Sequence, residues 1–494
     1  MDNKKMISNG VVYFFSSLFT QSVNLVLIPL YTNNLTQEQY GQFDLIMSVQ
    51  QLLMLGITLG VFSGMVRFFN EYENRQELRN TALTFSLLWG SICVLIIWLV
   101  NPFIYPMLFD SIPGSNLFLP FVIMSSVLVC LNLIYSSYYA MQFQALKSSA
   151  VQIATIVTTL LLALYFFLVL DMGIIGILQA QLFSNLAVFI VLFLIHLKSF
   201  KLRWKQDQLR KMLSYGTGLM LGDISAWVLS LSDRFLIRGF MNLSSVAVYS
   251  IGYKIGMLIN PFFINPFTSV FTPFKYKVYN EENGQERIGK MFRLYNFVGW
   301  LCVLGLSLFA NIGVSLVATE EYRDANYVIP IIALSYFLSG AIAFYSLGLH
   351  IANKMRLNSA ITVIAALVNI LCNMLLIPWM GIYGSALSTV IAYVISNLLF
   401  YRFGSKYYPL RLSLWEPYKY LVVFVPIYGI HVVVMQMWPS LLLELLLNGV
   451  LCIVFVLVSL FCSFISRDEL MNVLQQVILR KVRKLSYKGV QAKS

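Results

Sequence analysis

The chain has 494 residues, of which 59% are hydrophobic and 11% are charged, and its formal net charge is +13. Soluble domains carry about 25% charged residues, so this composition excludes an ordinary soluble globular protein. Apolar runs of about 20 residues recur along the chain, and each is long enough to cross about 30 Å of hydrocarbon. We therefore predict an all-α polytopic membrane protein.

Fourteen membrane spans are predicted in chain order. The first apolar run continues too far for a cleaved signal peptide and is taken as the first span. The second and eighth runs are long, which indicates tilt or kinks. The predicted spans lie near residues 8–31, 38–65, 82–105, 117–140, 149–170, 174–196, 213–233, 245–273, 294–317, 327–349, 358–378, 382–402, 419–437 and 441–465.

The basic residues alternate between the connections of these spans. Thirty of the 34 Lys and Arg residues lie in the N-terminus, the even-numbered loops and the C-terminal tail. The odd-numbered loops carry only Arg234, Arg238 and Arg323, and Lys254 lies within a span. The positive-inside rule then places both termini in the cytoplasm. The same distribution argues against nucleic acid as a partner, because the basic residues face the cytoplasmic lipid surface.

The first six spans resemble the next six at a separation near 208 residues. Asp171–Gly176 matches Trp379–Gly384 at its Met, its first Ile and both glycines. Two halves with an even number of spans insert with the same orientation, so they form parallel repeats, as in alternating-access transporters. The predicted division is a first lobe at 1–197, a basic cytoplasmic loop at 198–212, a second lobe at 213–403, two extra spans at 404–465, and a basic amphipathic helix on the inner leaflet at 466–494.

The seventh and eighth spans carry an unusual number of charges for a membrane hairpin. An ionisable group in a span costs roughly 2.5–3.5 kcal/mol on insertion scales. Asp223 and Lys254 are expected at similar depths, about 15 and 14 Å from their respective span entries at 1.5 Å per residue. Two interpretations stay open: a structural ion pair, or a Lys254 that faces a wet cavity and meets an anionic substrate. Asp233 and Arg234 are expected near the external end.

Further polar residues of the first lobe are candidates for the same cavity. Gln21 and Asn24 lie in the first span, Asp44 lies close to the position equivalent to Lys254, and Arg67 marks the cytoplasmic end of the second span. The eighth span also contains three prolines, which favour kinks because each removes a backbone hydrogen bond. They are Pro261, Pro266 and Pro273.

No catalytic motif is found in the sequence. HExxH, GxSxG and phosphate-binding loops are missing, as are Cys/His spacings typical of metal sites. We therefore predict a protein that is not an enzyme and that has neither a metal nor a cofactor. A membrane glycosyltransferase or polymerase is the less favoured alternative, since the external connections are too short for a catalytic domain.

Four segments resemble the Wzx-type polysaccharide flippases of the multidrug/oligosaccharidyl-lipid/polysaccharide (MOP) exporter superfamily. They are Pro29–Gly41, Gly64–Phe68, Ser232–Ile237 and Tyr249–Ile255, and the resemblance covers essentially the whole chain. It implies two six-helix lobes around a central cavity, in the fold shared with the multidrug and toxic compound extrusion (MATE) transporters. The implied location is the bacterial cytoplasmic (inner) membrane.

The resemblance also implies a cargo. It would be an undecaprenyl-pyrophosphate-linked oligosaccharide, the repeat unit of an O-antigen of lipopolysaccharide, a capsule or an exopolysaccharide. The expected partners are this substrate, membrane lipids, and the polysaccharide polymerase and chain-length machinery. The nearest alternatives are a lipid II flippase and an ion-coupled multidrug antiporter of the same superfamily.

The resemblance extends to particular residues. Lys254 matches a position where the family usually has a basic residue, and Arg234 and Arg67 match its span-end arginines. Transport in the family is thought to be driven by H⁺, Na⁺ or the membrane potential. Asp223 and Asp233, together with Asp44, are the candidates for ion coupling, and the choice among them stays open.

Overall fold

A computed structural model describes residues 3–109, 115–409 and 412–466, and within these ranges the chain forms helices and turns without strands. The predicted all-α class is confirmed. The amphipathic helix expected at 466–494 lies, apart from Ser466, outside the described residues.

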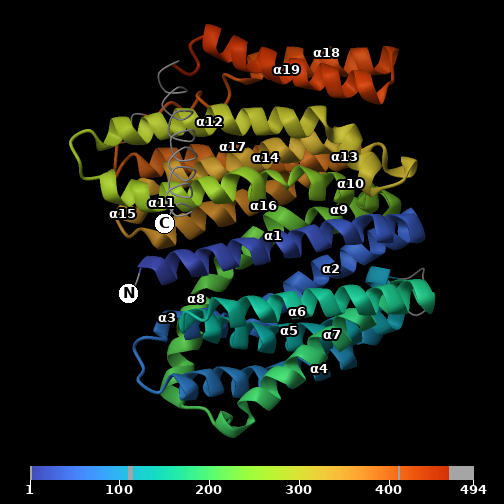
Figure 1. The fold of residues 1–494 in the computed structure, drawn as a ribbon, viewed down its shortest axis with the longest axis vertical. Coiled ribbons are helices and arrows are strands. Elements are labelled where there is room, and N and C mark those ends of the chain that lie inside the picture. Colours follow the sequence, from blue (N-terminus) through green and yellow to red (C-terminus); the bar gives the residue numbers. More distant parts are fainter. Residues whose placement is uncertain (1–2, 110–114, 410–411, 467–494) are drawn as a thin grey trace, which may run out of the picture. The chain divides into compact units, whose positions relative to one another are not determined.

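The helices follow one another with short connections (Figure 1). Their bounds are α1 Asn3–Asn34, α2 Gln37–Thr58, α3 Val61–Phe68, α4 Arg75–Phe109, α5 Phe118–Met141, α6 Ala145–Ala163, α7 Gly173–His196, α8 Gln206–Leu231, α9 Asp233–Phe240, α10 Leu243–Gly256, α11 Asn265–Val278, α12 Gly284–Leu308, α13 Ala310–Val317, α14 Ala325–Tyr345, α15 Leu347–Ile351, α16 Met355–Met380, α17 Ile382–Gly404, α18 Leu421–Met437 and α19 Leu441–Phe461. Short π and 3₁₀ turns join them at η1 Ser115–Leu117, η2 Leu164–Val169, η3 Leu197–Ser199, η4 Asn260–Ile264 and η5 Glu320–Tyr322.

Each predicted span corresponds to helical structure, but not all fourteen have the apolar length of a membrane-crossing helix. Among the described residues, eleven helices are long and apolar enough, and α2 with α3 forms a twelfth span bent by 52°. The other two predicted spans fall on α8 and α18. Helix α8 is too polar to count as a membrane-crossing helix, and α18 is apolar but only 17 residues long. The polytopic architecture is thus confirmed, and the count of fourteen stays a prediction.

The described residues divide into two compact units. The first unit holds the residues up to Ser250 together with Ser315–Arg323 and Asn373–Ile382, and the second unit holds the remainder. The boundaries of these two units differ from the expected lobe boundaries at 197 and 213. The lobe division, which rests on the repeat, stays a prediction.

Close backbone packing characterises the first unit. A Cβ atom on Gly41 would overlap the carbonyl oxygen of Leu243, so α2 can approach the start of α10 only because residue 41 is a glycine. Gly60 has a φ of +65° and lies against the backbone of Gly216 on α8. The glycine in the Tyr40–Gly41 part of the sequence motif is therefore explained by helix contact.

An aromatic core holds the second unit together. Tyr295 on α12 donates a hydrogen bond to the carbonyl oxygen of Phe337 at 2.5 Å, and the two rings stack with centroids 5.4 Å apart. Phe344 packs edge-on against Phe292, and Trp300 is fully buried beside Phe337. Ring pairs of this kind are worth about 0.5–1.5 kcal/mol each beyond the area that they bury.

The sequence repeat is visible in backbone geometry. Gly173 and Gly381, 208 positions apart, both adopt a φ of +56°. Gly173 is the first residue of α7 and Gly381 directly precedes α17, at the matching position of the segments Asp171–Gly176 and Trp379–Gly384. A positive φ is inexpensive only for glycine, which accounts for this shared residue.

A second pair of turns repeats in the same way. Phe143 and Asn353 have φ values of 58° and 53°, which is uncommon for residues other than glycine. In each case the next amide, that of Gln144 or Lys354, donates to the carbonyl five residues earlier, at 3.0 and 2.8 Å. Such bonds close the end of a helix before a tight turn. The two halves thus share turn geometry as well as residue matches.

The predicted break in the eighth span is confirmed. Helix α10 ends at Gly256, the π turn η4 contains Pro261, and α11 begins with Pro266 in its first turn. Proline is tolerated in a first turn because the amide that it lacks would have no helical partner there. Pro273 lies inside α11.

Candidate functional site

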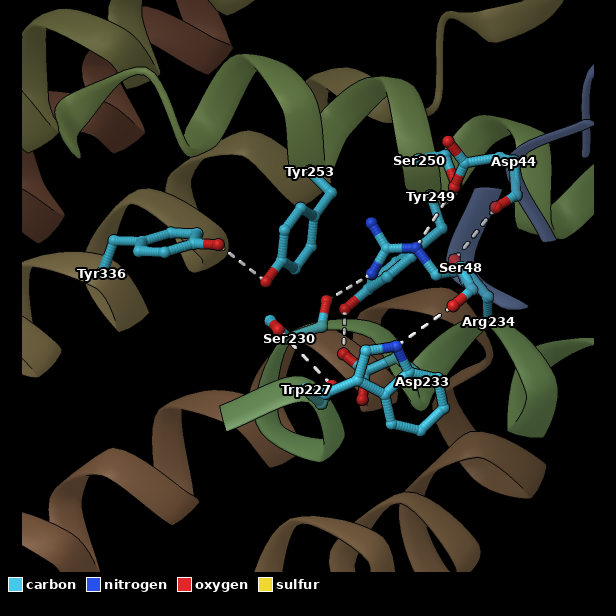
Figure 2. A network of polar contacts seen from close by, with 10 residues as sticks. All are labelled: Asp44, Ser48, Trp227, Ser230, Asp233, Arg234, Tyr249, Ser250, Tyr253 and Tyr336. Carbon is cyan, nitrogen blue, oxygen red and sulfur yellow. Dashed lines mark hydrogen bonds and ion pairs between the residues drawn. The ribbon is translucent and has the colours of Figure 1, made fainter. Parts of the chain in front are cut away.

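Oppositely charged buried residues of the first unit meet between α2, α9 and α10. Arg234, the second residue of α9, forms an ion pair with Asp44 of α2, with 3.2 Å between Nε and Oδ2. Both residues are at most 4% exposed. The Ser250 hydroxyl donates to the same Asp44 oxygen at 2.5 Å, so α10 joins this contact. Figure 2 shows the three side chains pointing toward one another.

Asp233 takes part in a second set of contacts. Its carboxylate accepts a hydrogen bond from the Tyr249 hydroxyl at 2.5 Å and another from the Asn373 amide of α16 at 3.0 Å. The Arg234 guanidinium lies 5.6 Å from the centre of the Tyr249 ring, within the range of a cation–π contact. We call these residues the aspartate–arginine network: Asp44, Asp233, Arg234, Tyr249, Ser250 and Asn373.

Asp233 and Arg234 have different partners because they occupy successive positions of α9. Helix α8 ends at Leu231, and Asp233 is the first residue of α9. Successive helical residues point about 100° apart because a turn contains 3.6 residues. Asp233 therefore reaches Tyr249 and Asn373, whereas Arg234 reaches Asp44 and donates to the Ser230 carbonyl oxygen at 2.6 Å.

The two acids and one arginine of this network give it a particular chemistry. A buried ion pair gains little net stability, since desolvation offsets the attraction, but removal of one partner costs about 3–5 kcal/mol. Neutral donors such as Tyr249 and Asn373 stabilise the charged form of Asp233 without cancelling its charge. The network can thus hold α2, α9, α10 and α16 together and can also respond to a proton or a small cation.

The predicted pair of Asp223 and Lys254 stays a prediction. Asp223 is an exposed residue of α8 in the first unit, and Lys254 is a half-buried residue in the last turn of α10, in the second unit. In the second unit α10 packs closely on α14. A Cβ atom added to Gly252 would overlap Val328, and one added to Gly256 would overlap Ile332.

The other predicted substrate contacts lie on accessible surface of the first unit. Gln21 and Asn24 are exposed residues of α1. Arg67 is exposed at the end of α3, where it pairs with Glu71 at 2.8 Å and lies over the Phe68 ring. An exposed ion pair of this kind is worth about 0–1 kcal/mol. Arg67 is thus available to an external ligand at little cost in stability.

Sequence reasoning did not identify Ser250 and Asn373 as members of the network. Asn369 and Asn373 stand one turn apart in the apolar run of α16, and that spacing of amides was a usable signal. Arg79 was also missed, since it was counted in a cytoplasmic connection. It is 1% exposed at the start of α4, where it donates to Ser199 and lies 4.8 Å from the Tyr138 ring centre.

Solved structures of other proteins share this fold at low sequence identity. The lipid II flippase MurJ, in an inward closed conformation, superposes with a TM-score of 0.71 at 14% identity, covering 91% of this chain and 98% of that chain. An inward-facing MATE family transporter of the MOP superfamily gives a TM-score of 0.64 at 16% identity, covering 78% and 94%. The chain therefore has the same fold as these two proteins.

The family follows from the sequence profile. The profile of the polysaccharide biosynthesis protein family matches residues 6–278, more than half of the chain. The chain belongs to this family, and the resemblance to the MOP-superfamily polysaccharide flippases is confirmed. A probable low-salt glycan biosynthesis flippase, Agl15 of Haloferax volcanii, is 22% identical over 41% of this chain and 44% of that protein. The family and the structural neighbours are transporters and flippases rather than enzymes.

Proposed function

We propose that this protein moves a lipid-linked oligosaccharide, carried on polyprenyl pyrophosphate, across the bacterial cytoplasmic membrane by alternating access. The observation that carries the proposal is the family match, which extends from α1 to the end of α11 and includes the whole aspartate–arginine network except Asn373. The likeness of the fold to a lipid II flippase supports it. Both termini would lie in the cytoplasm, and the polysaccharide polymerase would receive the product.

Lys254 is the proposed contact for the pyrophosphate. It is half-buried in a helix that ends two residues later and gives way to a π turn. A cation at a partly desolvated site attracts phosphate more strongly than one in bulk water. Ionisable residues within spans generally mark substrate or ion paths. Arg67, Gln21 and Asn24 would contribute on exposed surface.

The aspartate–arginine network is the proposed coupling element. Protonation of Asp44, or binding of a cation beside Asp233, would weaken the hold of the carboxylates on Arg234 and Tyr249. Because these contacts tie α2 to α9 and α10, their loss would free those helices to shift. Arg234 would then act in coupling rather than in direct binding of the cargo. Asp223, which is exposed, remains a second candidate for the coupling ion.

The test compares variants in the host from which the gene has been deleted. Complementation with the wild type should restore surface polysaccharide, whereas Lys254→Ala should leave polymer low and lipid-linked precursor accumulated on the inner leaflet. Lys254→Arg should restore part of the function because it keeps the charge. Lys290→Ala is the matched control, since Lys290 is exposed and pairs with Glu286 one turn away on α12.

Other outcomes would assign other functions. Normal polymer with an altered resistance to cationic dyes would favour a multidrug antiporter. Defects in peptidoglycan precursor export would favour a lipid II flippase. A Lys254→Ala protein that is present at normal levels and restores polymer fully would contradict the cationic site.

A further inference from the structure

A second polar region lies in the first unit, and no charged residue lines it. It is a cavity of about 480 Å³ formed by α1, α2, α5, α6 and α7. Of the sixteen residues that line it, eleven are amides or hydroxyls, and none is charged. We call it the amide cavity, and its most polar residues are Gln50, Gln51, Asn132, Gln152, Thr155 and Asn185.

Two groups at this cavity are buried with unused hydrogen-bonding capacity. Asn132 is 5% exposed, and its amide nitrogen donates to the carbonyl oxygen of Asn185 at 3.0 Å. Its carbonyl oxygen accepts no hydrogen bond from any residue that the structure describes, and the Ser125 hydroxyl likewise has no partner among them. A buried polar group without a partner costs about 1–3 kcal/mol. Both atoms therefore favour an occupant that supplies hydrogen bonds.

We propose that the amide cavity binds the sugar portion of the cargo, as an uncharged carbohydrate site. Amide side chains offer both donors and acceptors, and hydroxyls offer both on one atom, which matches the alternating needs of sugar hydroxyls. A phosphate would instead call for Arg or Lys. The volume lies within the range of about 300–1,000 Å³ typical of small-molecule sites. This inference rests on the proposed function and extends it to a separate contact for the glycan.

The test uses purified protein in lipid nanodiscs and two probes: polyprenyl pyrophosphate carrying a disaccharide, and polyprenyl pyrophosphate alone. Wild type should bind the sugar-bearing lipid about tenfold more tightly, the equivalent of one or two net hydrogen bonds. Thr155→Val combined with Gln152→Leu should remove this preference and leave the affinity for the bare lipid unchanged.

The matched control is Thr158→Val on the same helix. Thr158 lines a different groove, between α6 and α7, together with Ala154 and Ala187. It does not line the amide cavity. It should retain the preference.

Each result separates this inference from the proposed function. Equal affinity of the wild type for both probes, with transport of the lipid in proteoliposomes intact, would overturn the sugar site alone. Equal weakening of both lipids by the cavity variant would also overturn it. Binding of neither probe by the wild type would overturn the sugar site and the flippase proposal together.

Discussion

Asp44 and Arg234 are 190 residues apart in the chain and form one buried ion pair. The pair links α2 to α9, and both side chains are removed from water. Ser250 also donates to Asp44, and Arg234 also donates to the Ser230 carbonyl oxygen, so the pair is part of a larger set of buried contacts.

Removal of one member of the pair should be more damaging than removal of both. We expect Arg234→Met to lower the free energy of unfolding by about 3–5 kcal/mol, since Asp44 would be left as a buried charge. Asp44→Leu combined with Arg234→Met should recover a large part of this loss. Thermal unfolding of the four purified proteins in detergent would measure the coupling. Additive losses would contradict a direct pair.

Tyr249→Phe removes the hydroxyl that donates to Asp233. A hydrogen bond to a charged group contributes about 1.5–3 kcal/mol, so we expect a loss of that size. The phenyl ring should still pack as before, which isolates the hydroxyl. Tyr72→Phe, outside the network on the connection between α3 and α4, is the control and should unfold like wild type. If the two variants were equally stable, the Tyr249 contact would contribute nothing.

Gly41→Ala should be harmful for a steric reason. The new Cβ would overlap the Leu243 carbonyl oxygen, and overpacking of this kind costs about 1–3 kcal/mol. Gly218→Ala on α8 has open space and should gain up to about 1 kcal/mol from helix propensity. Expression level and melting temperature of both variants would check the contrast. Tolerance of alanine at residue 41 would mean that the helices can separate there.

The Arg67→Ala variant separates an effect on substrate transport from an effect on the stability of the fold. The exposed pair with Glu71 contributes at most about 1 kcal/mol, so the melting temperature should change little. If Arg67 contacts the pyrophosphate, transport in proteoliposomes should fall severalfold. Glu71→Ala removes the same ion pair and leaves the cation, so it should retain transport. Equal transport by both variants would remove Arg67 from the substrate path.

The sequence was sufficient for the helical class, because apolar runs, glycines and prolines act locally. The kink of the eighth span could be read from its prolines. The partners of Asp233 and Arg234 could not be read, since depth estimates treat helices as straight rods. Their expected position near an external end stays a prediction, and the structure adds that both side chains are buried in the first unit.

The same long separation within the Asp44–Arg234 pair has a consequence during synthesis. Chains grow at about 5–20 residues per second, so Asp44 is made roughly 10–40 s before Arg234. Throughout that interval the second helix must enter the membrane without its cation. The nascent chain would have to keep Asp44 protonated, leave that helix at the membrane surface, or rely on an insertion chaperone until the seventh span arrives.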